Sequence, residues 1–234
     1  MKKHLLKLST FASLPLLSLA AISCSNKQNI PPRDYEMVNV ETNGLAFNSE
    51  GVITKFYNFG GSTDINLVIP EYLVNNRILT SEYYGYKQRI TTIGGWVFSA
   101  QTKYDIPSGQ YKPIHNEYAQ YLSSITLPNS IETIGPDAFR ETPLTEIILP
   151  DSVVNIGDEA FRYCTNLTSV KLSKNTKYIK TNAFYYSGLK GELYIPDSVL
   201  GIYSGAFDGT QITEVSIPKD CVYNSDSFPP NCKV

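Results

Sequence analysis

The chain has 234 residues, of which 42% are hydrophobic and 18% charged, and its formal net charge at pH 7 is −2. This composition is ordinary for a soluble globular or repeat protein and excludes a disordered chain. If the leader described next is removed with Lys2, Lys3 and Lys7, 17 basic and 22 acidic residues are left, a net charge of −5. Because nucleic-acid binding needs a dense basic face, we expect no nucleic-acid partner.

Residues 1–23 have the pattern of a secretory signal peptide. Residues 1–7 are basic, and residues 8–22 form an apolar run interrupted by Pro15. That run is shorter than the roughly 20 residues of a membrane-spanning helix, so we expect a cleaved leader.

The sequence AISC at residues 21–24 resembles a bacterial lipobox, although Ala21 stands where Leu is more usual. The longer phrase LPLLSLAAISCSN is similar to the leaders of mollicute surface lipoproteins. The resemblance implies that Cys24 is lipidated and anchors the protein on the extracellular face of a bacterial cell membrane. The alternative is a signal peptide cleaved before an ordinary structural cysteine.

Two short regions follow the leader. Residues 24–36 are polar, contain Pro31 and Pro32 and show no periodicity, so we expect a lipid-anchored tether. Residues 37–64 show two alternating apolar runs on either side of a Gly-containing turn at residues 49–51, which predicts a β-hairpin. This N-terminal β cap should cover the open end of the repeats that follow.

A phrase of 22 or 23 residues then recurs, starting at Leu122, Leu144, Leu167, Leu189 and Ile212. A fixed period of this size indicates a solenoid. Within each phrase, apolar residues two apart predict a strand, Pro150 and its equivalents end it, and Gly157 and its equivalents mark a turn. Residues 158–161 predict a single helical turn. We expect one internal column of aromatic rings: Phe139, Phe161, Phe184 and Phe207.

The first repeat, residues 65–121, contains two insertions, near Tyr72–Arg89 and around Ser99–Tyr121. Insertions in a solenoid form surface loops that often bind partners. These two are rich in tyrosine, which suits an interface, but the rings could also pack on the insertions themselves. Trp96 could be exposed or could pack beneath them. The tyrosines are Tyr72, Tyr83, Tyr84, Tyr86, Tyr104, Tyr111, Tyr118 and Tyr121.

The strand positions two and four before each proline should face solvent in two rows. The first row is Val68, Thr126, Ile148, Lys171, Tyr194 and Ser216, and the second is Asn66, Ser124, Glu146, Ser169, Glu192 and Glu214. Their mixed chemistry favours a protein or glycan partner, although a merely solvated sheet would look the same. The candidate partner-binding residues are Thr126, Glu146, Ile148, Lys171, Glu192, Tyr194 and Glu214 from the rows, with Tyr83, Tyr84 and Tyr86 from the first insertion.

The sequence offers no catalytic or metal-binding constellation. His115 is the only histidine after the leader, and no phosphate-binding glycine motif is present, so we expect no cofactor, no metal and no enzymatic activity. Cys164 should be a core thiol. Cys221 and Cys232 could form a disulfide in a secreted protein, or could be two buried thiols; a mass increase of two protons on reduction distinguishes the two.

The pattern L-x-x-I-x-L-P-x-S-V-x-x-I-G-x-x-A-F at residues 144–161 resembles the BspA-like leucine-rich repeat of bacterial and protist surface proteins. Weaker copies extend the resemblance to about residues 65–220; Ser173 replaces the proline, and Lys180 and Tyr203 the glycine. The resemblance implies a curved, β-rich leucine-rich-repeat solenoid with short helical turns between strands.

The resemblance also implies adhesion. We therefore expect a membrane-anchored surface protein that binds a macromolecule of a host or neighbouring cell through the solenoid face and the tyrosine-rich loops. The alternative is a structural or assembly partner of another membrane protein, and an unrecognised hydrolase is the least favoured reading.

Lipidation at Cys24 gives a direct prediction. A palmitate analogue fed to cells should label the wild-type protein and not Cys24→Ala, because only the thiol of Cys24 can carry the anchor. Labelling is measured by gel fluorescence after affinity purification. Equal labelling of the two proteins would remove the lipid anchor.

Overall fold

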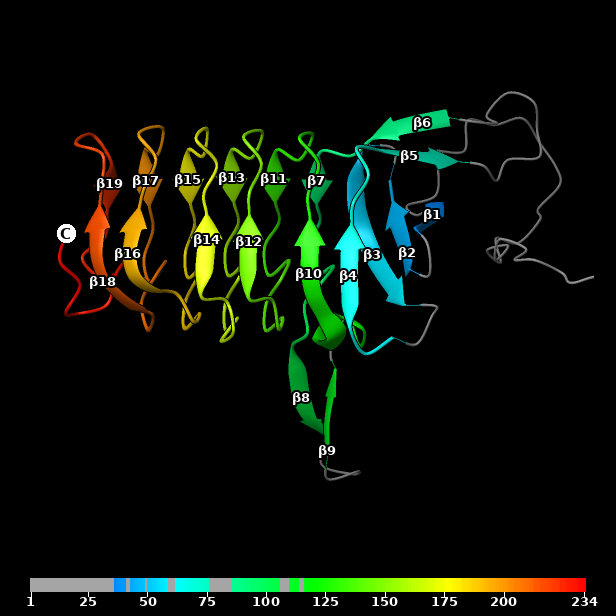
Figure 1. The fold of residues 1–234 in the computed structure, drawn as a ribbon, viewed down its shortest axis with the longest axis horizontal. Helices are drawn as coiled ribbons and strands as arrows, with labels where there is room; N and C mark the ends of the chain where they lie inside the picture. Colours follow the sequence, from blue (N-terminus) through cyan, green and yellow to red (C-terminus); the bar gives the residue numbers. More distant parts are fainter. Residues whose placement is uncertain are drawn as a thin grey trace, which may run out of the picture.

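The computed structural model describes residues 36–40, 43–48, 50–58, 62–75, 86–105, 110–113 and 116–234. The predicted signal peptide, Cys24 and nearly all of the tether lie outside the described residues. The described part is a stack of coils along one axis, with the cap at one end and the C-terminus at the other (Figure 1).

Each coil contributes one strand to each of two rows, and the strands within each row are parallel where they pair. The first row consists of β4 (Ile65–Val68), β10 (Leu122–Thr126), β12 (Glu146–Ile148), β14 (Ser169–Lys171), β16 (Lys190–Tyr194) and β18 (Gln211–Ser216). The second row consists of β7 (Thr92–Ile93), β11 (Thr133–Ile134), β13 (Asn155–Ile156), β15 (Tyr178–Ile179), β17 (Gly201–Ile202) and β19 (Val222–Tyr223). The chain is therefore the β-rich solenoid that its repeat predicts.

The second row joins the N-terminal cap in one continuous sheet. The antiparallel strands β1 (Glu36–Val40), β2 (Asn43–Phe47) and β3 (Val52–Asn58) precede the repeats, and β3 pairs in parallel with β7. The sheet order is β1-β2-β3-β7-β11-β13-β15-β17-β19. The buried side chains of Leu45 and Phe47 from β2 and Ile53 and Phe56 from β3 continue the core, so the cap covers its N-terminal end.

The first row is not the single stacked sheet that the sequence suggested. It consists of three separate pairs, β4–β10, β12–β14 and β16–β18. The β4–β10 and β16–β18 pairs each contain a register shift, at residues 122–124 and at Gly191/Glu192. An extra residue in one strand disrupts the regular ladder locally, so these two pairs are also irregular within themselves.

Residues 158–161 do not form the expected helical turn. Glu159 has a φ of 56°, as Asp137 (52°) and Asn182 (55°) have in the neighbouring coils. This left-handed conformation cannot continue a right-handed helical turn, so the segment is a series of hydrogen-bonded turns. The backbone instead bonds to the next coil: the N–H of Phe139 donates to the carbonyl of Ala160 over 2.8 Å, and that of Phe161 to Ala183 over 2.7 Å.

The glycines before these turns are needed for close packing between coils. A Cβ on Gly157 would lie 2.8 Å from the carbonyl carbon of Gly135, and one on Gly135 would lie 2.7 Å from the carbonyl oxygen of Ile93. Both distances are too short for a side chain. The turn that these glycines predict is present, but what requires glycine there is the neighbouring backbone.

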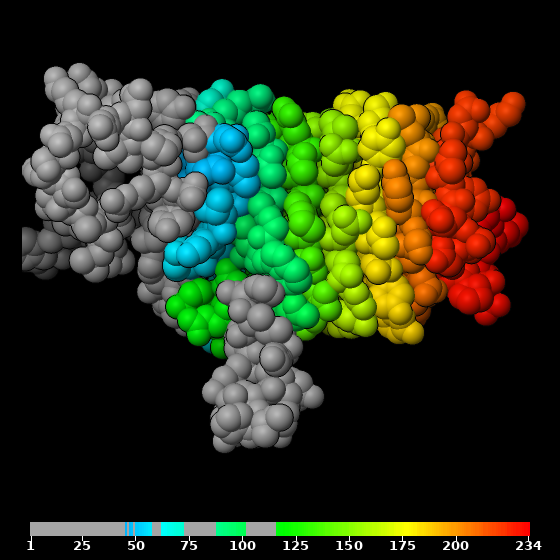
Figure 2. Space-filling model, turned by 180° about the vertical axis from the view of Figure 1, so that it is seen from behind, coloured from blue at the N-terminus to red at the C-terminus, as the bar shows by residue number. Residues whose placement is uncertain are grey.

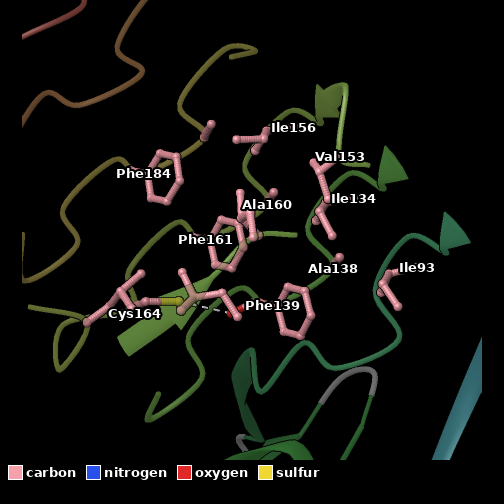
Figure 3. Packing of buried hydrophobic residues seen from close by; sticks show 14 of the residues in the cluster. Ile93, Ile134, Ala138, Phe139, Val153, Ile156, Ala160, Phe161, Cys164 and Phe184 are labelled. Atoms are coloured by element: carbon pink, nitrogen blue, oxygen red, sulfur yellow. Dashed lines mark hydrogen bonds between the residues drawn. The ribbon is translucent and has the colours of Figure 1, made fainter. Parts of the chain in front are cut away.

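The predicted column of phenylalanines runs through the core (Figure 3). Phe139 and Phe161 have centroids 5.1 Å apart and planes within 5°, and Phe161 and Phe184 are 4.9 Å apart, also within 5°. Phe207 continues the stack 5.2 Å beyond Phe184. The column extends past the predicted rings, to Phe98 and Phe56 towards the cap and to Phe228 at the C-terminal end.

Both insertions form antiparallel hairpins where surface loops were expected. The first contains β5 (Tyr72–Asn75) and β6 (Tyr86–Arg89), and the second contains β8 (Thr102–Asp105) and β9 (Gln110–Pro113), followed by the 3-10 helix η1 (Ala119–Tyr121). In Figure 1 the two hairpins lie at opposite ends of β4 and β10. They therefore flank the N-terminal part of the first row.

The aromatic column predicts the stability of the stack. Phe161→Ala should cost about 3–5 kcal/mol in free energy of unfolding, because a fully buried ring with neighbours on both faces leaves a cavity. Phe228→Ala is the matched control, since Phe228 stacks on one phenylalanine only and should cost less. Urea unfolding followed by circular dichroism measures both. An unchanged midpoint for Phe161→Ala would contradict the role of the column.

Candidate functional site

All twelve outward positions of the first row are exposed, as the sequence predicts. We call this surface the outer strand face; it comprises Asn66, Val68, Ser124, Thr126, Glu146, Ile148, Ser169, Lys171, Glu192, Tyr194, Glu214 and Ser216. Between them, inward residues such as Ile147, Leu149 and Leu193 are buried. The two-residue period of each strand thus separates the side chains that build the core from those that face solvent.

Three large apolar side chains stand on this face. Val68 and Ile148 are each 59% exposed, and Tyr194 is 64% exposed. The β12–β14 register sets Ile148 beside Lys171, and the β16–β18 register sets Tyr194 beside Ser216. Because Ile148 and Tyr194 are exposed on a rigid scaffold, they offer apolar contact area at low cost in conformational entropy. Tyrosine is also enriched at protein interfaces.

Carboxylates give the face its charge pattern. Glu192 lies directly opposite Glu214, and Lys233 relieves the repulsion by approaching Glu214 with Nζ to Oε1 at 3.1 Å. Neither Glu192 nor Glu146 has an ion pair with any described residue. Outside the outer strand face, Lys174 Nζ lies 2.6 Å from Asp151 Oδ2, and this hydrogen bond lowers the pKa of Asp151. The face therefore offers two carboxylates for a partner's cationic or hydrogen-bond-donating groups.

The structure describes only some of the tyrosines in the two insertions. Tyr83 and Tyr84 lie outside the described residues, and Tyr86 opens β6, but its side chain is not described. Tyr72 is exposed at the start of β5, whereas Tyr118 and Tyr121 pack partly against the core. The part played by Tyr83, Tyr84 and Tyr86 stays a prediction.

A cationic and aromatic cluster at the turns was missed by sequence reasoning. The guanidinium of Arg162 lies 4.8 Å from the ring centroid of Tyr163 and 5.0 Å from that of Tyr185, and Tyr186 is 50% exposed beside them. Arg162 also pairs with Glu159 at 2.7 Å. The signal was present in the sequence, because aromatic residues follow the column phenylalanine by one or two positions in neighbouring coils.

A second cluster lies on the nine-stranded sheet. Lys180 Nζ lies 5.3 Å from the ring centroid of Tyr178 and 4.5 Å from that of Tyr203. Lys180 and Tyr203 occupy the position where earlier coils have glycine, so these departures from the repeat carry side chains that meet on the surface. Cation–π contacts of this kind contribute about 0.5–1 kcal/mol at exposed sites.

The cysteines of the described part are free thiols. Cys164 is fully buried, with Sγ 3.0 Å from the carbonyl oxygen of Phe139 and 3.3 Å from Thr142 Oγ1 (Figure 3). Burial raises the pKa of Cys164 to about 12. Cys221 and Cys232 are unpaired in the structure; Cys221 is buried as expected for its inward position, whereas Cys232 is only partly buried. Whether the two form a disulfide stays a prediction.

Within the described ranges, no cluster of three or more His, Cys, Asp or Glu side chains could hold a metal ion. Likewise, no helix among the residues that the structure describes is long and apolar enough to cross a membrane. What the geometry does present is an extended, exposed array of mixed side chains on a rigid repeat scaffold. This combination defines a solenoid repeat protein with a broad outer surface.

The repeats identify the family. Residues 115–233 match six copies of the BspA type leucine rich repeat region, and the chain belongs to this family. Such repeats generally serve protein–protein interaction or surface adhesion, are typically not enzymes, and often occur in cell-surface proteins. Among curated proteins, none matches the chain.

Two solved structures share the fold. The T. pallidum leucine-rich repeat protein is 20% identical with a TM-score of 0.54, over 87% of this chain and 84% of its own. The pneumococcal vaccine antigen PcpA is 20% identical with a TM-score of 0.52, over 80% of this chain and 51% of its own, so the similarity spans about half of that antigen.

The buried thiol predicts selective reactivity. Iodoacetamide at pH 8 should leave Cys164 unmodified in the folded protein, because a pKa of about 12 keeps it protonated and burial blocks access. Cys232, which is only partly buried, should react faster. Peptide mass spectrometry after timed quenching measures both rates, and unfolding in urea should make Cys164 reactive. Rapid native modification of Cys164 would contradict its place in the core.

Proposed function

We propose that this protein is a lipid-anchored surface protein that binds a macromolecule, protein or glycan, of a host or neighbouring cell through the outer strand face together with the tyrosine-rich insertions. The observation that carries the proposal is that all twelve outward positions are exposed. The family supports it, since BspA type repeats generally serve interaction or adhesion.

The size of the outer strand face favours a contribution from the insertions. Six strands about 4.8 Å apart, each roughly 4–5 residues long at ~3.3 Å per residue, project an area on the order of 400 Å². A standard protein interface buries about 800 Å² on each partner. The face alone supplies about half of this, and the hairpins at opposite ends of β4 and β10 extend the available surface at that end (Figure 1).

The chemistry of the face favours a macromolecule over a small molecule. Ile148 and Tyr194 supply apolar anchors, while Glu146, Glu192 and Lys171 supply charges that fix orientation. These groups lie along an extended row instead of converging in an enclosed cavity, which is where small ligands bind. The anchor at Cys24 would keep the face close to the membrane, because the predicted tether extends at most about 35–40 Å.

Binding of the purified chain to host matrix proteins and host cells tests the proposal. The variant Ile148→Asp with Tyr194→Ala should weaken binding at least about tenfold, because interface aromatic and apolar anchors dominate binding energy. The variant Tyr83→Ser with Tyr84→Ser and Tyr86→Ser should weaken it as well. Leu200→Ser is the matched control, since Leu200 is an exposed apolar residue outside this face, just before β17. Biolayer interferometry measures each affinity.

Two outcomes would contradict the proposal. If the double variant of the outer strand face and the triple tyrosine variant both bind with wild-type affinity, the contact lies elsewhere on the molecule. Absence of any host ligand, combined with recovery of one fixed partner from the protein's own membrane after cross-linking, would support the assembly-subunit alternative instead.

A further inference from the structure

An open depression with a volume of about 680 Å³ lies across the turns of three successive coils near the C-terminal end of the described stack. Its lining comes from Tyr186, from residues 208–213 and from residues 229–231. In Figure 2 these coils are the amber, orange and red layers. The volume lies in the range of ligand-binding pockets, and no residue of the outer strand face lines the depression.

A glycine in the middle coil opens this depression. In the coils from Phe139 onward, the residues two positions after the column phenylalanine form a row along the turns: Glu141, Tyr163, Tyr186, Gly209 and Pro230. Gly209 is the one member of this row without a side chain, so a gap is left between Tyr186 and Pro230. The backbones on the two sides of the gap are two coil steps apart, about 9–10 Å.

The ring of Tyr186 forms one wall of the gap. It meets Tyr185 at a centroid distance of 4.6 Å and Tyr163 at 5.9 Å, both in tilted geometry. It also lies against Gly209, where an added Cβ would be 2.3 Å from Tyr186 Cδ2. These contacts fix the position of the ring, yet Tyr186 is 50% exposed. The wall is therefore preformed and accessible, and a preformed site loses little conformational entropy on binding.

Polar side chains without partners line the rest of the depression. The carboxylate of Asp208, the amides of Gln211 and Asn231 and the hydroxyl of Thr213 form no hydrogen bond or ion pair with any described residue. Asp208 is partly exposed and the other three are exposed, so a ligand can reach all of them. The lining thus combines an open aromatic ring with several free hydrogen-bonding groups.

We propose that this depression binds one hexopyranose residue of a glycan, with its C–H face against the ring of Tyr186 and its hydroxyl groups bonded to the free carboxylate and amides of the lining. A pyranose ring offers an apolar C–H face and a rim of hydroxyl groups that both donate and accept. The Asp208 carboxylate accepts, whereas the amides of Gln211 and Asn231 donate and accept. The lining therefore provides both kinds of partner that sugar hydroxyl groups need.

A quaternary ammonium ligand, which aromatic rings and carboxylates also recognise, fits less well. Such cations are held in cages of several aromatic rings, whereas Tyr186 is the single aromatic residue among the described residues of the lining. A quaternary ammonium group also has no hydrogen-bonding group for Gln211 and Asn231. The sugar site does not depend on the function proposed for the outer strand face.

Saturation-transfer difference NMR detects binding at this site. The full-length chain, purified in mild detergent, is titrated with the methyl glycosides of glucose, galactose, mannose and N-acetylglucosamine, and separately with choline chloride. At least one glycoside should show saturable transfer, strongest at the C–H protons of the face that contacts Tyr186. Absence of saturable transfer for every glycoside overturns the proposal, and so does saturable binding of choline alone.

Two variants test the assigned contacts. Tyr186→Asn removes the ring, and asparagine tolerates the left-handed backbone at this position, where φ is 51°. Asp208→Asn removes the charge with almost no change in size. Each should raise the Kd for the active glycoside at least about tenfold. Asp208→Asn should leave the Tm unchanged, because this carboxylate bonds to no described residue.

Tyr194→Ala is the matched control, since it removes a comparably exposed tyrosine from the outer strand face. It should bind the glycoside with wild-type affinity. Wild-type affinity in both Tyr186→Asn and Asp208→Asn overturns the proposal, and so does a tenfold loss of affinity in Tyr194→Ala. These results do not depend on whether the outer strand face binds a host macromolecule.

Discussion

The structure depends on the fixed translation between successive coils. Backbone ladders impose a repeat of about 4.7–4.9 Å, and the phenylalanine rings of the column follow at 4.9–5.4 Å with planes within 7° of one another from Phe98 to Phe228. Hydrogen bonds from one turn to the next, such as Phe139 N–H to Ala160, hold the same step. A single coil has neither a ladder partner nor a neighbouring ring, so each coil is stable only within the stack.

This translation also determines which residues are free to vary. Gly135 and Gly157 are confined by backbone atoms of the preceding coil, and Ile147 and Phe161 by the core. Outward positions carry no such constraint, so their chemistry can change from coil to coil without altering the fold. The family match therefore describes the scaffold, and under the proposed function the identity of a partner depends on the outer strand face and the hairpins.

The sequence predicted the features that recur at equivalent positions of the repeat. The repeat, the phenylalanine column, the inward Cys164 and the exposed rows all follow from matching positions of successive phrases. It was wrong where neighbouring backbone decides the conformation: the turns contain left-handed residues such as Glu159, and the first row divides into pairs. The hydrogen bond from Asn116 to the carbonyl of Phe56 could not be predicted, because it joins segments sixty residues apart that share no repeat position.

The two ends of the stack differ in protection. The N-terminal end is covered by three antiparallel strands, whereas in the last coil the ring of Phe228 meets Tyr223 edge-on at 6.0 Å and β18 has a single bridge to Lys233 among the described residues. Local opening is cheapest where a unit has one neighbour instead of two. The cap therefore makes the first coils of the stack more resistant to local opening than a coil with one neighbour, a difference that the repetitive sequence does not reveal.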